Sequence, residues 1–253
     1  MSTLPLVPLI FRALRKRLLI LGGFAALLLL LAGVARALSA GADHAELDRI
    51  FELGGATLGA AFIVLGWLLS RFPMLATLVL LAGVFSADHA TGLTRLYAVR
   101  PVAPLRLYAM KFGVLCASAF ILSAILLPLF DVLLLGQWNG PATLVLSAAY
   151  ILAYAGLIAL LSVFTRADSW VALLLGLFAM TWSGLRNMDM LGAIPAGGRH
   201  FVTLILPPHN SLLALENAFG QMLPIPWNAF IDVAIYGATL SVLAALALLR
   251  REV

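Results

Sequence analysis

Residues 142–164 read ATLVLSAAYILAYAGLIALLSVF and contain no charged side chain. A helix needs about 20 mainly apolar residues to cross the roughly 30 Å hydrocarbon core of a bilayer. This stretch has the length and the composition of one such crossing. It therefore predicts a transmembrane helix, and the same test applies to the rest of the chain.

The composition of the whole chain agrees with a membrane protein. Of its 253 residues, 63% are hydrophobic and only 11% are charged, whereas a soluble domain is about 45–50% apolar and about 25% charged. The chain also lacks the repeats or the polarity of fibrous and disordered proteins. Its lone cysteine, Cys116, excludes an intrachain disulfide. We therefore expect a multi-pass membrane protein.

Further segments are apolar and long enough to span a bilayer. Four of them need little argument: Leu18–Val34, Phe112–Leu135, Trp170–Leu185 and Ala229–Leu249. Segment 53–86 is interrupted by Arg71 and Pro73. Because proline removes a backbone donor and kinks a helix, one broken or tilted crossing is the economical interpretation. A re-entrant stretch before the true span is the alternative.

The distribution of charges predicts which side each loop occupies. Segment 1–17 carries four basic and no acidic residues, and 87–111 carries four basic and one acidic residue. Segment 36–52 carries two basic and four acidic residues. Since Lys and Arg near span ends favour the cytoplasm, 1–17 and 87–111 lie inside and 36–52 lies outside. Segment 53–86 then crosses an odd number of times.

The predicted fold is an all-α membrane protein with six transmembrane helices and both termini in the cytoplasm. Residues 1–253 form a single transmembrane domain in the cytoplasmic (inner) membrane. Residues 1–17 are either an amphipathic, basic segment at the inner interface or an ordinary basic flank that sets orientation. The positive charge of the chain follows this topology, so no nucleic-acid partner is expected.

The cytoplasmic loop 87–107 contains the most distinctive pattern of the chain. Residues 88–106 read DHATGLTRLYAVRPVAPLR. Apolar side chains recur at helical spacing before Pro101, which stops the helix because the residue before a proline avoids the helical region. Such a helix would present Arg95 and Arg100 to a soluble partner or to lipid headgroups. Alternatively, the loop is basic only to set the orientation of the chain.

This loop resembles the ABC-2 type permease family, the membrane subunits of ABC exporters. Family members commonly show an acidic residue, Gly-Thr-Leu, a helical turn, Pro, a basic residue and then Lys. Here Gly92 precedes Pro101 by nine positions, and Lys111 follows it by ten. The chain departs from the pattern at Leu93, where Thr is usual, at Arg100, which replaces a small polar residue, and before the Lys, where Met110 replaces Gly.

The resemblance implies a mechanical role for the loop. In such exporters it is a coupling helix that sits in a cleft of a separate ABC ATPase subunit. The corresponding residues here are Asp88, Gly92, Leu93, Arg95, Leu96, Arg100, Pro101, Arg106 and Lys111. The chain has no G-x-x-x-x-G-K-[ST] motif, so ATP and Mg²⁺ would bind the partner and no cofactor is expected in this chain. The resemblance also implies an ABC-2 (type V exporter-like) permease fold and a homodimer or a heterodimer with a related permease.

The long outer segment 186–227 predicts an extracytoplasmic re-entrant or interfacial element. Its prolines divide it, and Asn210 or Ser211 can cap a helix that runs from Leu212 to Phe219. Such a helix is apolar enough to enter the outer leaflet near the exit of a transport path. A lid that merely covers the bundle explains the same pattern.

Asp131 and Asp232 are the acidic residues nearest the hydrocarbon region. An ionisable residue inside a span is a functional candidate by default, so both are candidates for a substrate path. Solvated carboxylates at the outer interface, or carboxylates that cap the ends of helices, are the plainer interpretation. The Met and His residues of the outer loops have no ligand spacing, and no catalytic motif such as G-x-S-x-G or H-E-x-x-H occurs. We therefore expect neither a metal site nor catalytic residues.

Together these patterns predict the permease subunit of an ATP-driven exporter, embedded in the lipid bilayer. The sparse polar side chains of the spans mildly favour a lipidic or amphipathic cargo. A secondary carrier or a channel is the main alternative, although such proteins should show two related halves with broken helices at matching positions. A third possibility is a membrane subunit that transports nothing and anchors other proteins.

Overall fold

The computed structural model describes residues 7–41, 64–86, 104–135, 138, 140–188, 190–191, 194–221 and 223–251. Within these ranges the chain forms helices and turns and no strand, which confirms the all-α prediction. Five helices are long and apolar enough to cross a membrane. They are α1 (Val7–Gly41), α6 (Pro104–Leu135), α7 (Ala142–Phe164), α8 (Asp168–Asn187) and α11 (Trp227–Arg251).

A sixth candidate span is broken in the middle, where the sequence predicts an interruption. The short helix Val64–Ser70 and α3 (Phe72–Leu81) meet at Arg71 with a bend of 54°. Pro73 lies in the first turn of α3, a position where its missing N–H breaks no helical hydrogen bond. The pair is a broken span or a re-entrant loop. Residues 53–63 lie outside the described part, so the re-entrant alternative stays a prediction.

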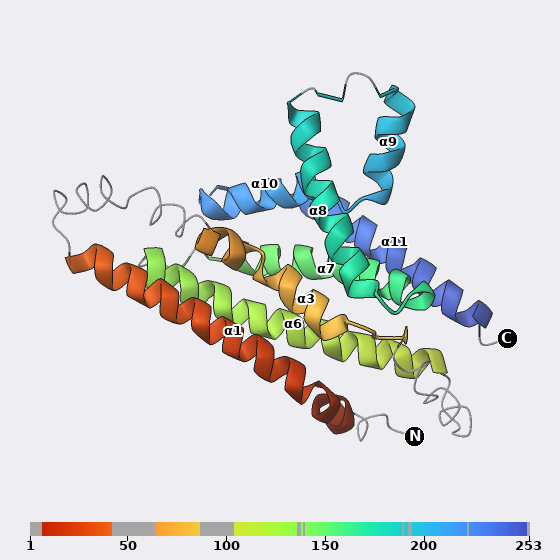
Figure 1. Ribbon diagram of the computed structural model, residues 1–253, viewed down its shortest axis with the longest axis horizontal. Helices are drawn as coiled ribbons and strands as arrows, with labels where there is room; N and C mark the ends of the chain where they lie inside the picture. Colours follow the sequence, from red (N-terminus) through yellow and green to blue (C-terminus); the bar gives the residue numbers. More distant parts are fainter. Residues whose placement is uncertain are drawn as a thin grey trace.

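Helix α7 lies at the centre of the molecule. Sixty-seven per cent of its apolar window is buried, against 22–33% for the other four long helices. It contacts α3, α6, α8, α11 and the shorter helix α10 (His209–Gly220). Figure 1 shows α1, α3, α6 and α11 running alongside it with similar axes. A movement of α3, α8, α10 or α11 against the bundle therefore involves α7.

The backbones of α7 and α11 touch at two glycines. A Cβ atom added at Gly156 would overlap the Gly237 carbonyl, and one added at Gly237 would overlap the Leu152 carbonyl. Small residues let membrane helices approach this closely. Because no larger side chain fits at either position, these glycines fix the distance between the two helices.

The bundle has two distinct ends. Helix α1 begins and α11 ends at the same side of the bundle, shown at the right of Figure 1. We call this side the terminal end and the other side the opposite end. The chain reaches the first residue of α8 at the terminal end and the first residue of α11 at the opposite end. The assignment of the terminal end to the cytoplasm stays a prediction from the charges.

The segment between α8 and α11 is helical, as the sequence predicts. It forms α9 (Ala196–Ile205) and α10, which packs against α7, α8 and α11. In Figure 1, α9 lies beside the far part of α8, and α10 runs across the opposite end of the bundle. The predicted capping residue is wrong: α10 begins one residue before Asn210, its N-cap is Pro208, and no side chain caps it.

Candidate functional site

Most of the predicted coupling residues lie outside the described part of the chain. They are Asp88, Gly92, Leu93, Arg95, Leu96, Arg100 and Pro101. The structure does describe Arg106, which is exposed on α6, and Lys111, which is half-buried on the same helix. It also describes the turn 82–86, which connects α3 to the loop and is the base of the predicted coupling element.

This turn reverses the chain through a glycine. Gly83 has a φ of 66°, in the left-handed region that glycine adopts without strain. The Val84 N–H donates to the Leu81 carbonyl at 2.9 Å, so the turn closes tightly at the end of α3. The other backbone groups of such a turn need partners, because an unpaired polar group is costly in an apolar environment.

Two basic side chains from neighbouring helices bind the carbonyl groups of the turn. Arg17 of α1 donates from Nη1 to the carbonyls of Leu80, at 2.9 Å, and Ala82, at 2.7 Å. Lys111 of α6 donates to the Val84 carbonyl at 2.8 Å. The sequence predicted that Arg17 helps to set the orientation of the chain and that Lys111 belongs to the coupling loop. In the structure, each of these side chains binds specific backbone carbonyl groups.

Two further helices supply acceptors for the N–H groups of the same turn. The Ser162 hydroxyl of α7 accepts from Phe85 and Ser86 at 3.0 and 3.1 Å. The carboxylate of Asp168, the first residue of α8, accepts from the Gly83 N–H at 2.9 Å. Asp168 is buried and also accepts from the Ser169 N–H at 2.7 Å. A carboxylate at this position is stabilised by the partial positive charge of the helix N-terminus.

We call this arrangement the loop-base cluster: residues 82–86 with Arg17, Lys111, Ser162 and Asp168. Cations bind the carbonyl groups and acceptors bind the N–H groups, so the turn is attached to α1, α6, α7 and α8 at once. The sequence did not single out Ser162 or Asp168. An acidic residue at the start of a span was the available signal for Asp168.

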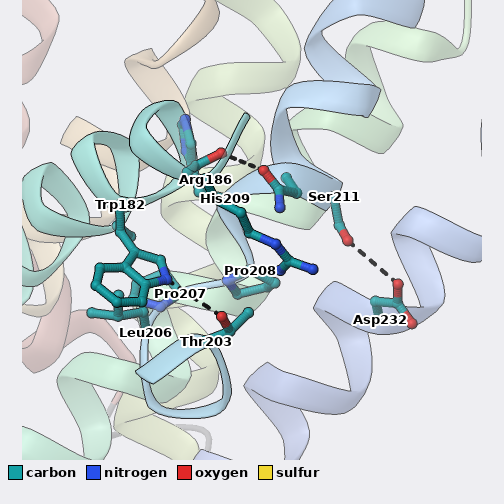
Figure 2. Close-up of a pocket in the computed structure, with 12 residues that line it drawn as sticks. Trp182, Arg186, Thr203, Leu206, Pro207, Pro208, His209, Ser211 and Asp232 are labelled. Atoms are coloured by element: carbon teal, nitrogen blue, oxygen red, sulfur yellow. Dashed lines mark hydrogen bonds between the residues drawn. The ribbon is translucent and has the colours of Figure 1, made fainter. Parts of the chain in front are cut away.

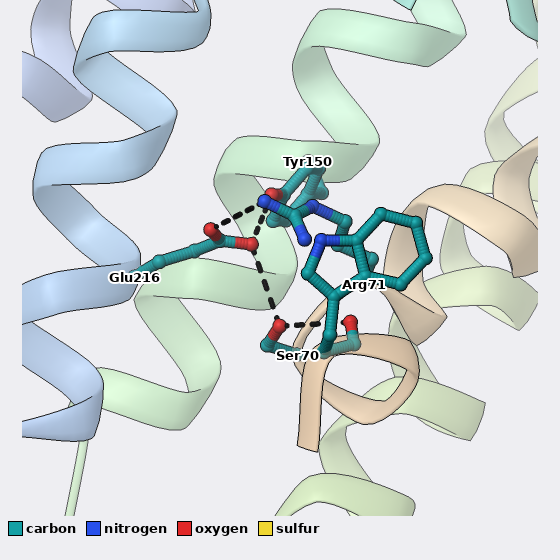
Figure 3. Close-up of polar contacts among 5 residues, drawn as sticks. Ser70, Arg71, Tyr150 and Glu216 are labelled. Carbon is teal, nitrogen blue, oxygen red and sulfur yellow. Dashed lines mark hydrogen bonds and ion pairs between the residues drawn. The ribbon is translucent and has the colours of Figure 1, made fainter. Parts of the chain in front are cut away.

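A second group of polar side chains joins the broken span to α10 and α7. Arg71 Nη2 pairs with Glu216 Oε2 of α10 at 2.9 Å, and their side chains are only 6% and 11% exposed. Tyr150 of α7 donates to Glu216 Oε1, and the Ser70 hydroxyl lies 3.4 Å from the same oxygen. Figure 3 shows the three side chains converging on the Glu216 carboxylate. We call Ser70, Arg71, Tyr150 and Glu216 the charged cluster.

The environment of Arg71 explains how a charge persists there. The guanidinium carbon lies 4.5 Å from the centre of the Trp67 ring, a cation–π geometry. Buried charges are stable in an apolar medium only when they are paired and hydrogen-bonded. The sequence identified Arg71 only as an interruption and missed Glu216. The available signal was the place of Glu216 one turn after Leu212, next to the buried residues Leu212 and Leu215 of the same helix.

Asp131 and Asp232 occupy different surroundings. Asp131 is buried on α6, in a turn whose following carbonyls, Val132 and Leu133, accept hydrogen bonds from Arg36 of α1 at 2.7 and 2.9 Å. Asp232 is exposed on α11 and accepts from the Ser211 hydroxyl at 3.3 Å. Burial does not fit the solvated carboxylate expected for Asp131. A role of either residue in a substrate path stays a prediction.

A cavity of about 290 Å³ lies between α8, α9, α10 and α11. Figure 2 shows the side chains around it. Its lining comprises Ala179, Trp182, Ser183, Arg186, Thr203, Leu206, Pro207, Pro208, His209, Asn210, Ser211 and Asp232. Ser183 donates to the side-chain amide oxygen (Oδ1) of Asn210, and Trp182 Nε1 lies 3.4 Å from the Thr203 hydroxyl. These bonds tie the first turn of α10 and the last turn of α9 to α8.

His209 lines this cavity, and its surroundings shift its pKa. Burial, and then the positive charge of Arg71, lower the pKa of His209 to about 4. The imidazole is therefore neutral near pH 7. Arg186 and Asp232 remain as the charged residues of the lining.

Comparisons with other proteins do not identify the chain. No protein-family model, no curated protein and no solved structure matches it. The membrane-protein class follows from the apolar helices themselves. Function has to be inferred from the residues and the geometry described above.

Proposed function

We propose that the chain is the permease subunit of an ATP-driven exporter of the ABC-2 type. A separate ATPase subunit would hydrolyse ATP, and a second permease, identical or related, would complete the transport path. The loop-base cluster is the observation that supports this role most directly. It joins the base of the predicted coupling loop to four helices through short hydrogen bonds.

Such an attachment suits the transmission of force. A displacement of the loop can enter the bundle through residues 82–86, which follow α3, and through Pro104, where α6 begins. From residues 82–86 it reaches α1, α6, α7 and α8 directly, and α11 through the glycine contact of α7 at Gly156 and Gly237. Because packed elements move as units between discrete arrangements, a pull on the loop would tilt several spans together.

A secondary carrier is the second candidate, and the charged cluster is the observation that favours it. Ionisable residues inside a membrane often mark ion or proton pathways, and broken helices form the binding sites of many carriers. Arg71 lies at the break of the Val64–Ser70 and α3 pair. Carriers built from repeats have broken helices at matching positions in both halves, and the described residues contain one such pair.

The test is ATP turnover by the chain purified together with its proposed ATPase partner, sought among the ABC ATPases encoded in the same genome. Replacing residues 88–106 with a Gly-Ser linker of equal length should abolish both stimulated turnover and complex formation. Asp168→Ala should leave the complex intact and lower stimulated turnover, since it frees the base of the loop. Arg199→Gln, at the other end of α8–α9, is the control and should retain full turnover.

Two results would decide against the exporter. Full stimulated turnover and full complex formation with the Gly-Ser linker would remove the coupling role. Substrate movement in vesicles that hold the chain alone, driven by a proton or ion gradient, would favour the carrier.

A further inference from the structure

The cavity between α8 and α11 combines opposite charges with neutral hydrogen-bonding groups. Arg186 lies in the last turn of α8 and Asp232 near the start of α11, and both side chains are exposed. Ser183, Asn210 and Ser211 add hydroxyl and amide groups to the same lining. His209 is neutral near pH 7 because its pKa is lowered to about 4. The cavity therefore complements a ligand with one negative and one positive group.

The size of the cavity limits what can fill it. Sites that enclose drug-sized ligands measure about 300–1,000 Å³, whereas this cavity measures about 290 Å³. A small polar group fits inside, and a larger molecule would extend beyond the mouth. The surface next to the mouth therefore decides which class of molecule can bind.

That surface is an apolar row on α8 that leads to the cavity. Leu174, Phe178 and Trp182 follow one another at intervals of four residues, so they share one face of the helix. Leu174 and Phe178 are 63% and 51% exposed, and the rings of Phe178 and Trp182 lie 6.1 Å apart. Trp182 itself lines the cavity. The row would face lipid in a bilayer, with its last member at the polar site.

We propose that this cavity binds the headgroup of a phosphoethanolamine phospholipid. The phosphate pairs with Arg186, the amine pairs with Asp232, and an acyl chain lies along Leu174 and Phe178. The site does not depend on the proposed function, because any multi-pass protein can hold a lipid at such a place.

The charges favour this headgroup over other lipids. Phosphatidylglycerol carries the phosphate but no amine, so Asp232 would gain no partner and would repel the lipid. A choline group lacks N–H donors and cannot hydrogen-bond to the carboxylate. A primary ammonium offers three donors, which suit Asp232 and the hydroxyl and amide oxygens beside it.

The test is photo-crosslinking of the purified full-length chain in nanodiscs. The probes are phosphatidylethanolamine and phosphatidylglycerol analogues that carry the same diazirine acyl chain, with mass spectrometry of the labelled peptides. We expect the ethanolamine probe to label the segment 174–182 of α8 at least about fivefold more than the glycerol probe. Arg186→Gln and Asp232→Asn should each remove most of this difference.

Matched variants and a soluble competitor separate this site from general lipid contact. Arg199→Gln lies outside the lining and should label as the unchanged chain does, and Trp182→Ala should reduce labelling where Trp170→Ala does not. Equal labelling by both probes, or labelling that neither Arg186→Gln nor Asp232→Asn alters, would overturn the proposal.

Glycerophosphoethanolamine carries the same headgroup but no acyl chain to contact Leu174 and Phe178, so it should compete only in large excess over the probe. Complete suppression at a concentration equal to that of the probe would assign the site to a soluble compound and overturn the lipid. None of these results depends on ATP turnover, so they are independent of the exporter test.

Discussion

The loop-base cluster and the charged cluster satisfy polar groups inside the same apolar bundle in different ways. At the terminal end, side chains of four helices bind backbone groups of one turn. At the break between Val64–Ser70 and α3, three side chains bind a single carboxylate, that of Glu216. The hydrogen bonds of the loop-base cluster come from four different side chains, whereas those of the charged cluster all depend on Glu216.

This difference predicts how each cluster responds to substitution. In the loop-base cluster each helix contributes a separate bond, so the loss of one leaves the others in place. In the charged cluster the loss of Glu216 leaves Arg71 buried without its counter-charge. An unpaired buried charge costs much more free energy than a lost neutral hydrogen bond. The two clusters should therefore differ in both the size and the kind of defect.

The largest expected effect comes from Glu216→Gln. It should lower the free energy of unfolding by about 3–5 kcal/mol, the usual cost of removing one partner of a buried ion pair. Chemical denaturation of the purified chain in detergent micelles would measure it. The double variant Arg71→Met/Glu216→Leu should recover most of the stability, because replacing a buried pair with apolar residues is often neutral. A double variant no more stable than Glu216→Gln would show that the pair is not the source of the loss.

A smaller effect is expected for Asp168→Ala. The substitution leaves the N–H groups of Gly83 and Ser169 without their carboxylate acceptor, which should cost about 1–3 kcal/mol in unfolding free energy. The exposed Asp232→Ala serves as the control and should change stability by less than about 0.5 kcal/mol. Hydrogen exchange at residues 82–86 should rise in Asp168→Ala alone. Unchanged exchange there would contradict a cluster that holds the turn.

The effect that is smallest at neutral pH concerns His209, in the first turn of α10. The pKa of His209 is about 4 in the folded chain, below its ordinary value of 6.5, so the unfolded chain binds a proton first as the pH falls. Stability from this group is complete above pH 6.5 and is lost as the pH falls through 4. His209→Gln should flatten the fall in melting temperature over that window. If the melting temperatures of the unchanged chain and of His209→Gln fall with pH in the same way, the lowered pKa of His209 is contradicted.

The sequence predicted the helices well because a bilayer leaves few choices. Runs of apolar residues such as 142–164 have to cross as helices, and the interruption at Arg71 and Pro73 appears as a 54° bend. The helix after residue 209 was also predicted, although its cap was not. The loop at 88–103 lies outside the described residues, so its coupling role remains a prediction.

The functional clusters were harder to predict because their members are far apart in the chain. Arg71 and Glu216 are separated by 145 residues, and Gly83 and Asp168 by 85. No local pattern relates such positions. Ser162 resembles any hydroxyl in an apolar span, and only the neighbouring turn makes it an acceptor for two N–H groups.

The amino-acid sequence alone determined that this chain crosses a membrane as helices, where the crossings fall and where one of them breaks. These properties follow from local composition, since each apolar segment must satisfy its own backbone in lipid. Only the tertiary structure decided which polar groups meet: Arg71 with Glu216, and Asp168 with the turn before the loop. It also placed Arg186 and Asp232 in the lining of one cavity. Those pairings depend on how the helices pack, which is set by close contacts such as Gly156 against Gly237 and not by any single segment.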